Sequence, residues 1–451
     1  MNSSIKNSLM LMISLFFFSS CASVDLKKEK EELKVVGSLI AHRYQLKNGL
    51  KLIVVEDHSS PTFAYYTWFN VGSRHEKKGK TGLAHLFEHM MFKGTKNHET
   101  GYFDLTLKKA GVEGLNAFTS HDYTAYIQQL PAGNLDLIAQ LEADRMQNLV
   151  VDQLAFKTET EVVQNERRMR NENSPDGTLQ QVLFEKAFRK HSYHWPVIGY
   201  QKDLDSMNAP DAMAFYQNFY QPSRATIVVV GDVDADDVLR SVDKYYGKIS
   251  SKEVVIPEIK KEPLQKKVRR STRKLNIQVE KLTIAYKVPS VSDIQTSATL
   301  EVLQALLSDG KASRLMRALV DTGVSSSIGT GSYQGANPTL FVIHTDLQKG
   351  KRYSQAESII LKELKKLQKR KVGKAELQRA KNLVQFQFYN RLRSNSEIAH
   401  FLGQYETSIG KFEKGIEIYN SVKNVTEKDI QKIVKKYFNP NQRTVVAGVK
   451  K

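Results

Sequence analysis

Alternation of apolar and polar positions marks the beginning of the folded chain. The segment Tyr44–Val55 alternates about the dipeptide Asn48-Gly49, which predicts a β-hairpin. Residues 63–71 predict a further strand directly after it. Thr81 is a candidate N-cap for an apolar-rich helix that extends to about Phe92. These elements predict a small sheet followed by a helix.

The rest of the first half continues to mix strands and helices. Residues 116–129 are rich in Thr, Tyr, Phe and Ala, and they predict two strands about a turn at 120–122. Apolar residues at helical spacing predict three helices, and a continuous apolar run before Gly231-Asp232 predicts a buried strand. The helices are expected at 135–149, 153–170 and 235–246, and the buried strand at 225–230.

The interval 250–274 differs from the segments on either side of it. It is charged, contains two prolines and has little apolar periodicity, which is typical of a linker. Beyond it the outline of the first half repeats, which predicts two homologous domains of about 200 residues each. The repeated elements are a strand at 282–288, a helix at 296–307 and strands at 339–345 and 444–449.

The first residues carry a targeting pattern. Lys6 precedes an apolar run at 9–18 that is too short to span a bilayer but suits a signal peptide. Small residues then precede Cys21, the only cysteine in the chain, in an arrangement that resembles a bacterial lipobox, although Phe18 stands where leucine is usual. We expect Cys21 to be lipidated and the protein to face the periplasm from the outer membrane of a Gram-negative bacterium. Plain secretion with cleavage nearby is the alternative.

These patterns divide the chain into five parts. They are a signal peptide (1–20), a charged tether (21–36), an N-terminal domain (37–250), a linker (251–275) and a C-terminal domain (276–451). With 41% hydrophobic residues and 11 prolines, the composition is that of a folded globular protein.

The net charge of +19 raises the question of a polyanionic partner. The basic residues gather at 260–273 and 362–374, where they alternate with apolar residues or flank a proline. A solvated linker and a solvated helix face explain these clusters better than a binding patch. We therefore expect no nucleic-acid partner, and binding to anionic envelope polymers remains an alternative that rests on net charge alone.

Candidate chemistry lies on the first predicted helix, in the run His85-Leu86-Phe87-Glu88-His89. Two imidazoles four residues apart share one helix face and can converge on a single ion. Glu88 lies near the same rim, where its carboxylate could take a proton from the attacking water. A hydrogen-bonded histidine pair in a core is the competing interpretation.

Zinc suits such a site, but a catalytic zinc site needs a third protein ligand. The predicted helix at 153–170 offers two carboxylates, Glu159 and Glu166, which are seven residues apart and so share one face. Their spacing alone leaves open which of the two would bind the metal.

The chain resembles the pitrilysin or insulinase family of zinc peptidases, in which the helix carries the order His-x-x-Glu-His. The resemblance implies that Glu166 is the third zinc ligand and that Glu159 supports the site. It also implies that Asn116 and Ala117 pair with the substrate backbone. The alternatives are a solvent-exposed Glu159 and an Asn116 that caps a hairpin. The matching segments are 44–50, 82–95, 116–120, Glu159 with Glu166, 196–199 and Gly231-Asp232.

One departure from the family pattern concerns the second half. Members that work alone or as homodimers usually carry an arginine and a tyrosine after a Ser-Arg-Leu run. Here Ser313-Arg314-Leu315 is present, but Val320 and Ser325 or Ser326 occupy the expected positions. We expect a heterodimer in which a homologous subunit supplies the pair, as in relatives that resemble the mitochondrial processing peptidase. A homodimer, with Tyr333 as a relocated substitute, is the alternative.

Together these features predict a two-domain α+β protein in which each half is a mainly antiparallel sheet covered by helices. The expected function is zinc-dependent hydrolysis of unfolded peptides in an enclosed chamber. A non-catalytic peptide-binding or scaffold lipoprotein of the same fold is the alternative.

Overall fold

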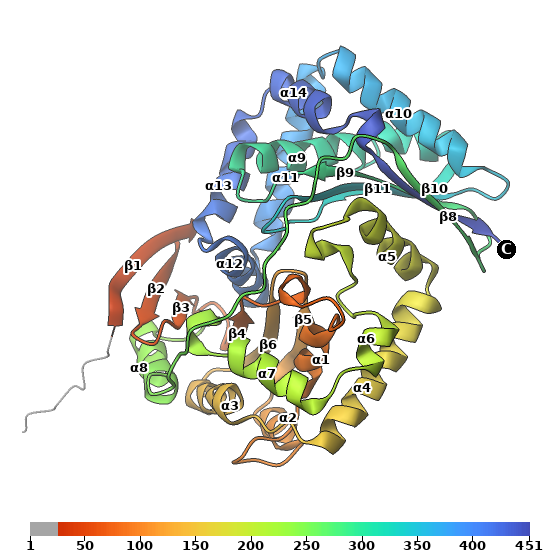
Figure 1. Cartoon of the computed structure of the whole chain (residues 1–451). Helices are drawn as coiled ribbons and strands as arrows, with labels where there is room; N and C mark the ends of the chain where they lie inside the picture. Colours follow the sequence, from red (N-terminus) through yellow and green to blue (C-terminus); the bar gives the residue numbers. More distant parts are fainter. Residues whose placement is uncertain (1–25) are drawn as a thin grey trace, which may run out of the picture.

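The computed structural model describes residues 26–451 (Figure 1). The predicted signal peptide and Cys21 lie outside the described residues. No helix among residues 26–451 combines the length and the apolar character needed to cross a membrane.

The first half is built on a seven-stranded sheet in the order β1-β2-β3-β7-β4-β6-β5. All neighbouring strands are antiparallel except β3 and β7, which are parallel. The predicted hairpin is confirmed as β2 and β3, and the predicted buried strand is the central β7. The bounds are β1 Leu26–Val36, β2 Leu39–Leu46, β3 Lys51–Glu56, β4 Thr62–Phe69, β5 Glu113–Thr119, β6 Thr124–Pro131 and β7 Ala225–Gly231.

The second half is built on a five-stranded sheet in the order β8-β12-β9-β11-β10. Its one parallel pair is β8 with β12, and the other pairs are antiparallel. Strand for strand this is the order β3-β7-β4-β6-β5 of the first sheet, so the predicted internal repeat is confirmed. The bounds are β8 Arg269–Leu275, β9 Lys281–Val288, β10 Ser325–Ser332, β11 Thr339–Leu347 and β12 Thr444–Lys450.

Helices cover the two sheets, and the α+β class is confirmed. In the first half they are α1 Leu83–Met90, α2 Tyr102–Lys109, α3 Leu135–Asn148, α4 Gln153–Arg167, α5 Pro175–Ala187, α6 Gln201–Asp205, α7 Ala209–Phe219 and α8 Ala235–Tyr246. In the second half they are α9 Ile294–Leu307, α10 Tyr353–Lys369, α11 Lys374–Arg391, α12 Asn395–Ile409, α13 Glu413–Ser421 and α14 Glu427–Tyr437.

Each half lends one helix to the sheet of the other half. Helix α5 of the first half packs against β8, β9 and β12, where Leu183 and Phe184 share a core with Val446. Helix α12 of the second half packs against β4 and β7, and it is drawn beside the first sheet in Figure 1. Because apolar faces are buried across the boundary in both directions, the two halves interlock.

Three expectations are wrong in detail. Residues 26–36 pair with β2 as an edge strand, so this part of the chain is not a free tether. The predicted linker extends too far, because its last residues form β8; the stretch without helix or strand between α8 and β8 is 247–268. Thr81 does not cap α1, since Gly82 occupies the N-cap position and the Thr81 hydroxyl donates to Asp203.

Candidate metal centre

Buried contacts at its N-terminus fix the position of helix α1. The carboxylate of Glu76 accepts hydrogen bonds from the backbone N–H groups of Gly82 (3.0 Å) and Ala84 (2.8 Å), which no residue inside the helix could satisfy. Gly82 also approaches Gly199 so closely that a Cβ would lie 2.6 Å from the carbonyl oxygen of Ile198. Glycine at this point, with φ of 92°, lets the helix begin against the neighbouring loop.

Helices α1 and α4 bring three predicted ligands together. Oε2 of Glu166 lies 3.3 Å from Nε2 of His89 and 3.8 Å from Nε2 of His85. Among the described residues, His85, His89 and Glu166 form the group whose ligand atoms all lie within 4.8 Å of one another. Two imidazole nitrogens and one carboxylate oxygen are the donor types of catalytic zinc sites, which keep a fourth position open. The donor set therefore fits zinc.

The remaining polar atoms of His89 and Glu166 are held by other side chains. Glu159 contacts Nδ1 of His89 at 3.4 Å, and the ammonium of Lys93 lies 2.6 Å from the other Glu159 oxygen. Arg170 lies 2.7 Å from Oε1 of Glu166. Such contacts orient a ligand and leave one nitrogen or oxygen free to face the metal. Glu159 is 7% exposed, so the solvent-exposed alternative is wrong.

The two histidines differ in the direction in which their pKa values are shifted. Burial, together with the neighbouring His89, lowers the pKa of His85 to about 4, so this imidazole is neutral at pH 7. Burial also opposes the charge of His89, but its contacts with Glu159 and Glu166 raise the pKa of His89 to about 9. In the other direction, the contact with His89 lowers the pKa of Glu166. Nδ1 of His85 is buried and has no hydrogen-bond partner among the described residues.

Glu88 lies on the same helix and faces strand β5. The hydroxyl of Thr119 donates to Oε2 of Glu88 at 2.5 Å. Burial raises the pKa of Glu88, and the hydrogen bond from Thr119 partly offsets that increase. A carboxylate with a raised pKa beside a metal site suits a general base that must also return its proton.

Strand β5 borders the same space and ends the first sheet, since its only neighbour in that sheet is β6. Asn116 and Ala117 pair with Ile127 and Tyr126 of β6, so their other edge is open to a further strand. Oδ1 of Asn116 accepts from the N–H of Ala117 within the strand, so the hairpin-cap alternative is wrong. A cavity of about 690 Å³ joins this strand to the three ligands and Glu88.

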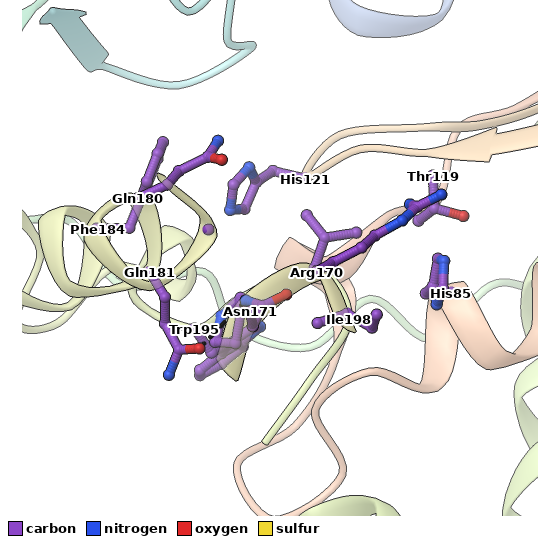
Figure 2. Close-up of a pocket in the computed structure, with 13 residues that line it drawn as sticks. His85, Thr119, His121, Arg170, Asn171, Gln180, Gln181, Phe184, Trp195 and Ile198 are labelled. Carbon is purple, nitrogen blue, oxygen red and sulfur yellow. Dashed lines mark hydrogen bonds between the residues drawn. The ribbon is translucent and has the colours of Figure 1, made fainter. Parts of the chain in front are cut away.

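A second cavity, of about 260 Å³, adjoins the first (Figure 2). His85, Thr119 and Arg170 line both cavities, so the two spaces meet beside the metal ligands. Figure 2 shows Arg170 extending toward Thr119 above His85. The other residues that line this cavity are His121, Asn171, Gly177, Gln180, Gln181, Phe184, Trp195, Pro196, Val197 and Ile198.

Residues at the positions of the missing Arg/Tyr pair lie away from these cavities. Val320 ends a short helical turn, and Ser325 and Ser326 begin strand β10 at the edge of the second sheet; none lines either cavity. Tyr333 does not line them either, but its hydroxyl accepts a hydrogen bond from Gln180 (3.2 Å) and its ring packs on Phe184.

Sequence reasoning missed three residues that contact the site. Lys93 and Arg170 each lie four residues after a predicted ligand, Lys93 just beyond the end of α1 and Arg170 in the turn that continues α4, and this spacing could have identified them. Thr119 gave no such signal, because its contact with Glu88 joins a strand to a helix 31 residues away in the sequence.

Comparisons with known proteins agree with this architecture. The profile described as "Insulinase (Peptidase family M16)" matches residues 51–201, and the one described as "Peptidase M16 inactive domain" matches residues 206–384. A zinc protease named PqqE from Helicobacter pylori is 31% identical over 407 residues, which cover 89% of this chain and 91% of the relative. A mitochondrial-processing peptidase subunit beta from Lentinula edodes is 22% identical and is covered over 86% of its length.

Solved structures show the same fold. A crystal structure of a protease from Helicobacter pylori superposes with a TM-score of 0.86 at 30% identity, covering 93% of this chain and 99% of that one. A putative M16-like peptidase from Alicyclobacillus acidocaldarius gives a TM-score of 0.82 at 17% identity and covers 93% of this chain and 100% of that one. The chain belongs to peptidase family M16, the insulinase family, whose relatives include zinc proteases.

Proposed function

We propose that this chain is a zinc-dependent endopeptidase that hydrolyses unfolded peptides. The observation that carries the proposal is the convergence of His85, His89 and Glu166 beside Glu88, in a cavity that also borders the open edge of β5. The zinc proteases among its relatives support the choice of metal.

In the proposed mechanism Glu88 transfers the proton of the attacking water at the metal site. When bound, zinc acts as a Lewis acid and lowers the pKa of water toward about 7. Glu88 accepts the proton of the attacking water and returns it to the leaving amine as the peptide bond breaks. The hydroxyl of Thr119 donates a hydrogen bond to Oε2 of Glu88 and so fixes the position of the carboxylate. Glu159 and Lys93 keep the imidazole of His89 oriented.

Substrate binding is proposed to use the open edge of β5. An extended peptide adds there as a further strand, with Asn116 and Ala117 supplying backbone hydrogen bonds. An unfolded segment presents the free backbone groups that such an edge pairs with, so the proposed substrates are unfolded peptides. The substrate is enclosed in a chamber while it is cleaved.

A second, homologous subunit is part of the proposal. Neither Val320 nor Ser325 and Ser326 supplies an arginine or tyrosine, and none of them lines the cavity of the metal site. We expect a partner chain to contribute that pair, and the homodimer remains the alternative. Purified chain that binds zinc but cleaves only after a homologous subunit is added would support the heterodimer, whereas full activity of the chain by itself would contradict it.

Placement in the cell envelope rests on the sequence of residues 1–21. We propose that Cys21 is lipidated and anchors the protein to the outer membrane, facing the periplasm. Replacing Cys21 by Ser is expected to release the protein from the membrane fraction into the periplasmic fraction. Unchanged membrane association of that variant would contradict the anchor.

The function is tested by comparing the mature chain with its Glu88→Gln variant on a pool of unstructured peptides, with zinc content measured in parallel. We expect about one zinc per chain in both proteins, and, once the homologous subunit is added, cleavage by the unsubstituted protein only. A chelator should abolish cleavage and added zinc should restore it. Glu161→Gln is the control, because Glu161 is exposed and lies on α4, the helix that also carries Glu166. Absence of zinc from both proteins would favour the scaffold alternative.

A further inference from the structure

The smaller cavity beside the metal ligands has no part in the mechanism proposed above. Its wall is aromatic: the rings of His121 and Phe184 stack at 5.0 Å with an interplanar angle of 25°, and Trp195 also lines the space. Val197 and Ile198 add aliphatic surface. A concave, mainly apolar space with a few polar groups at its rim is typical of a binding pocket.

The charged side chain that lines this cavity is a cation. Among the residues that line it, Arg170 is cationic and its side chain is 71% exposed, while Asn171, Gln180 and Gln181 are neutral amides. Burial lowers the pKa of His121 to about 4, so this imidazole is neutral at pH 7. No carboxylate of the described chain lines the cavity. A basic side chain inside it would meet the guanidinium of Arg170, whose counter-ion Glu166 lines the adjoining cavity, and would find no carboxylate on the wall of this one.

The imidazole of His121 also carries an unused polar atom. Its Nε2 is buried and has no hydrogen-bond partner among the described residues. A buried polar atom without a partner lowers stability unless a ligand or water satisfies it. It therefore offers a bound side chain one polar contact in an otherwise apolar wall.

The position of the cavity relative to β5 determines what can enter it. Thr119, the last residue of β5, lines both cavities, as does the ligand His85. A peptide added to β5 with its scissile bond at the metal ligands therefore directs a neighbouring side chain past His85 into the smaller cavity. The volume of about 260 Å³ accommodates a single large side chain.

We propose that this cavity, walled by His121, Phe184 and Trp195, is a specificity pocket that accepts an aromatic substrate side chain next to the scissile bond and rejects lysine and arginine. The inference rests on the proposed peptidase function. Gln180 is a positioning residue at the rim, held by its hydrogen bond to the hydroxyl of Tyr333 in the second half.

Peptide binding to the Glu88→Gln protein loaded with zinc tests the pocket without requiring cleavage. The probes are labelled peptides of Ala, Gly, Ser and Thr that carry one central Phe, Lys, Asp or Ala, and the readout is fluorescence anisotropy. The Phe peptide should bind about tenfold tighter than the Ala peptide, because one aromatic side chain is buried, and the Lys peptide should bind no better than the Ala peptide. Equal affinities, or a preference for Asp or Lys, would overturn the proposal.

Two substitutions in this background assign the preference to the pocket. Val197→Phe fills the cavity and should remove the advantage of the Phe peptide. Gln180→Glu adds a carboxylate at the rim and should improve binding of the Lys peptide by about tenfold. Gln355→Glu, the same charge change at an exposed site on α10, is the control. A preference for Phe that survives both Val197→Phe and Gln180→Glu would show that another surface selects the side chain.

Cleavage by the protein without the Glu88→Gln change distinguishes this proposal from the proposed function. Absence of cleavage both without and with the homologous subunit, together with selective binding, contradicts the peptidase and leaves the pocket intact. Cleavage of the peptide pool at sites with no adjacent aromatic residue contradicts the pocket and leaves the peptidase intact.

Discussion

The hydrogen bond from Thr119 to the candidate base Glu88 affects the position and the pKa of that carboxylate. Glu88 is buried, and within residues 26–451 its one hydrogen bond to a side chain comes from the Thr119 hydroxyl. A hydrogen bond to a charged group is worth about 1.5–3 kcal/mol, more than a bond between neutral groups. The position and the pKa of Glu88 therefore depend on a residue of another element.

Replacing Thr119 by Val removes the hydroxyl and keeps the shape of the side chain. We expect kcat to fall by about tenfold, because the accepting oxygen of Glu88 is no longer fixed and its pKa rises further. Zinc content should not change, since Thr119 contacts none of the three ligands in any hydrogen bond of the described chain. Steady-state kinetics and metal analysis measure both quantities. Thr158→Val on α4 is the control, and a Thr119→Val protein with full activity would contradict this role.

At the scale of elements, the end of helix α4 depends on close backbone contact with α5. Residues 168–172 continue α4 as a π-helical turn that carries Arg170. A Cβ at Gly177, in the first turn of α5, would lie 1.7 Å from the carbonyl oxygen of Arg170. Only glycine lets the two segments approach in this way, and the approach holds Arg170 beside Glu166.

Gly177→Ala should destabilise the protein by about 2 kcal/mol or more, as expected for a steric clash that the backbone must relieve. In an unconstrained helix the same change stabilises by up to about 1 kcal/mol, so the sign of the effect is informative. Denaturant unfolding gives the free energy, and zinc titration should show weaker binding because Arg170, which contacts Glu166, lies on the displaced segment. Gly373→Ala, with nothing within 4 Å of its Cβ, should change stability little. A stabilised Gly177→Ala protein would contradict the contact.

At the scale of the whole molecule, the halves are fastened by the exchanged helices and by the connecting segment. Gly403 of α12 faces Trp68 of β4, and a Cβ there would lie 2.0 Å from the indole nitrogen. In the connecting segment, Glu262 accepts hydrogen bonds from the N–H groups of Arg189 and Lys190 in the first half. The same carboxylate pairs with Lys287 of β9 in the second half at 2.9 Å.

Gly403→Ala should reduce the free energy of unfolding by about 1–3 kcal/mol, because the added methyl group forces Trp68 out of its packing. In the double variant with Trp68→Phe, the loss should be smaller than the sum of the two single losses, since the smaller ring makes room. Denaturant unfolding of the four proteins measures this coupling. Additive losses would show that the two residues do not meet across the interface.

Glu262 predicts how stability depends on pH. Burial opposes its charge, but the N–H groups of Lys190 and Arg189 and the ammonium of Lys287 lower the pKa of Glu262 to about 2. A carboxyl group with a depressed folded-state pKa stabilises the protein above its unfolded pKa, and this contribution is lost as the pH falls toward 2. Glu262→Gln should therefore cost on the order of 2 kcal/mol at pH 7 and less at pH 3.

Unfolding of the unsubstituted protein and the Glu262→Gln variant at both pH values measures that difference. Glu258→Gln, at an exposed position of the same segment, is the control and should have little effect. A loss of equal size at pH 7 and pH 3 would show that the charge of Glu262 is not what fastens the halves.

The sequence by itself determined what depends on the geometry of one element. The two histidines share a face of α1, and Glu159 and Glu166 share a face of α4, because helical periodicity fixes which side chains lie together. The same local rules predicted the hairpin, most strands and the internal repeat. They predicted the charged segment at 26–36 poorly, because pairing with β2, rather than its own composition, makes it a strand.

Only the tertiary structure decided what depends on contacts between elements. It separated the roles of the two glutamates, since Glu166 faces both histidines while Glu159 contacts Nδ1 of His89 and Lys93. It also brought Thr119 to Glu88, and it formed the aromatic cavity from segments that are far apart in the chain. The exchange of α5 and α12 belongs to the same class, because an apolar helix face shows that it must be buried but not which sheet will cover it.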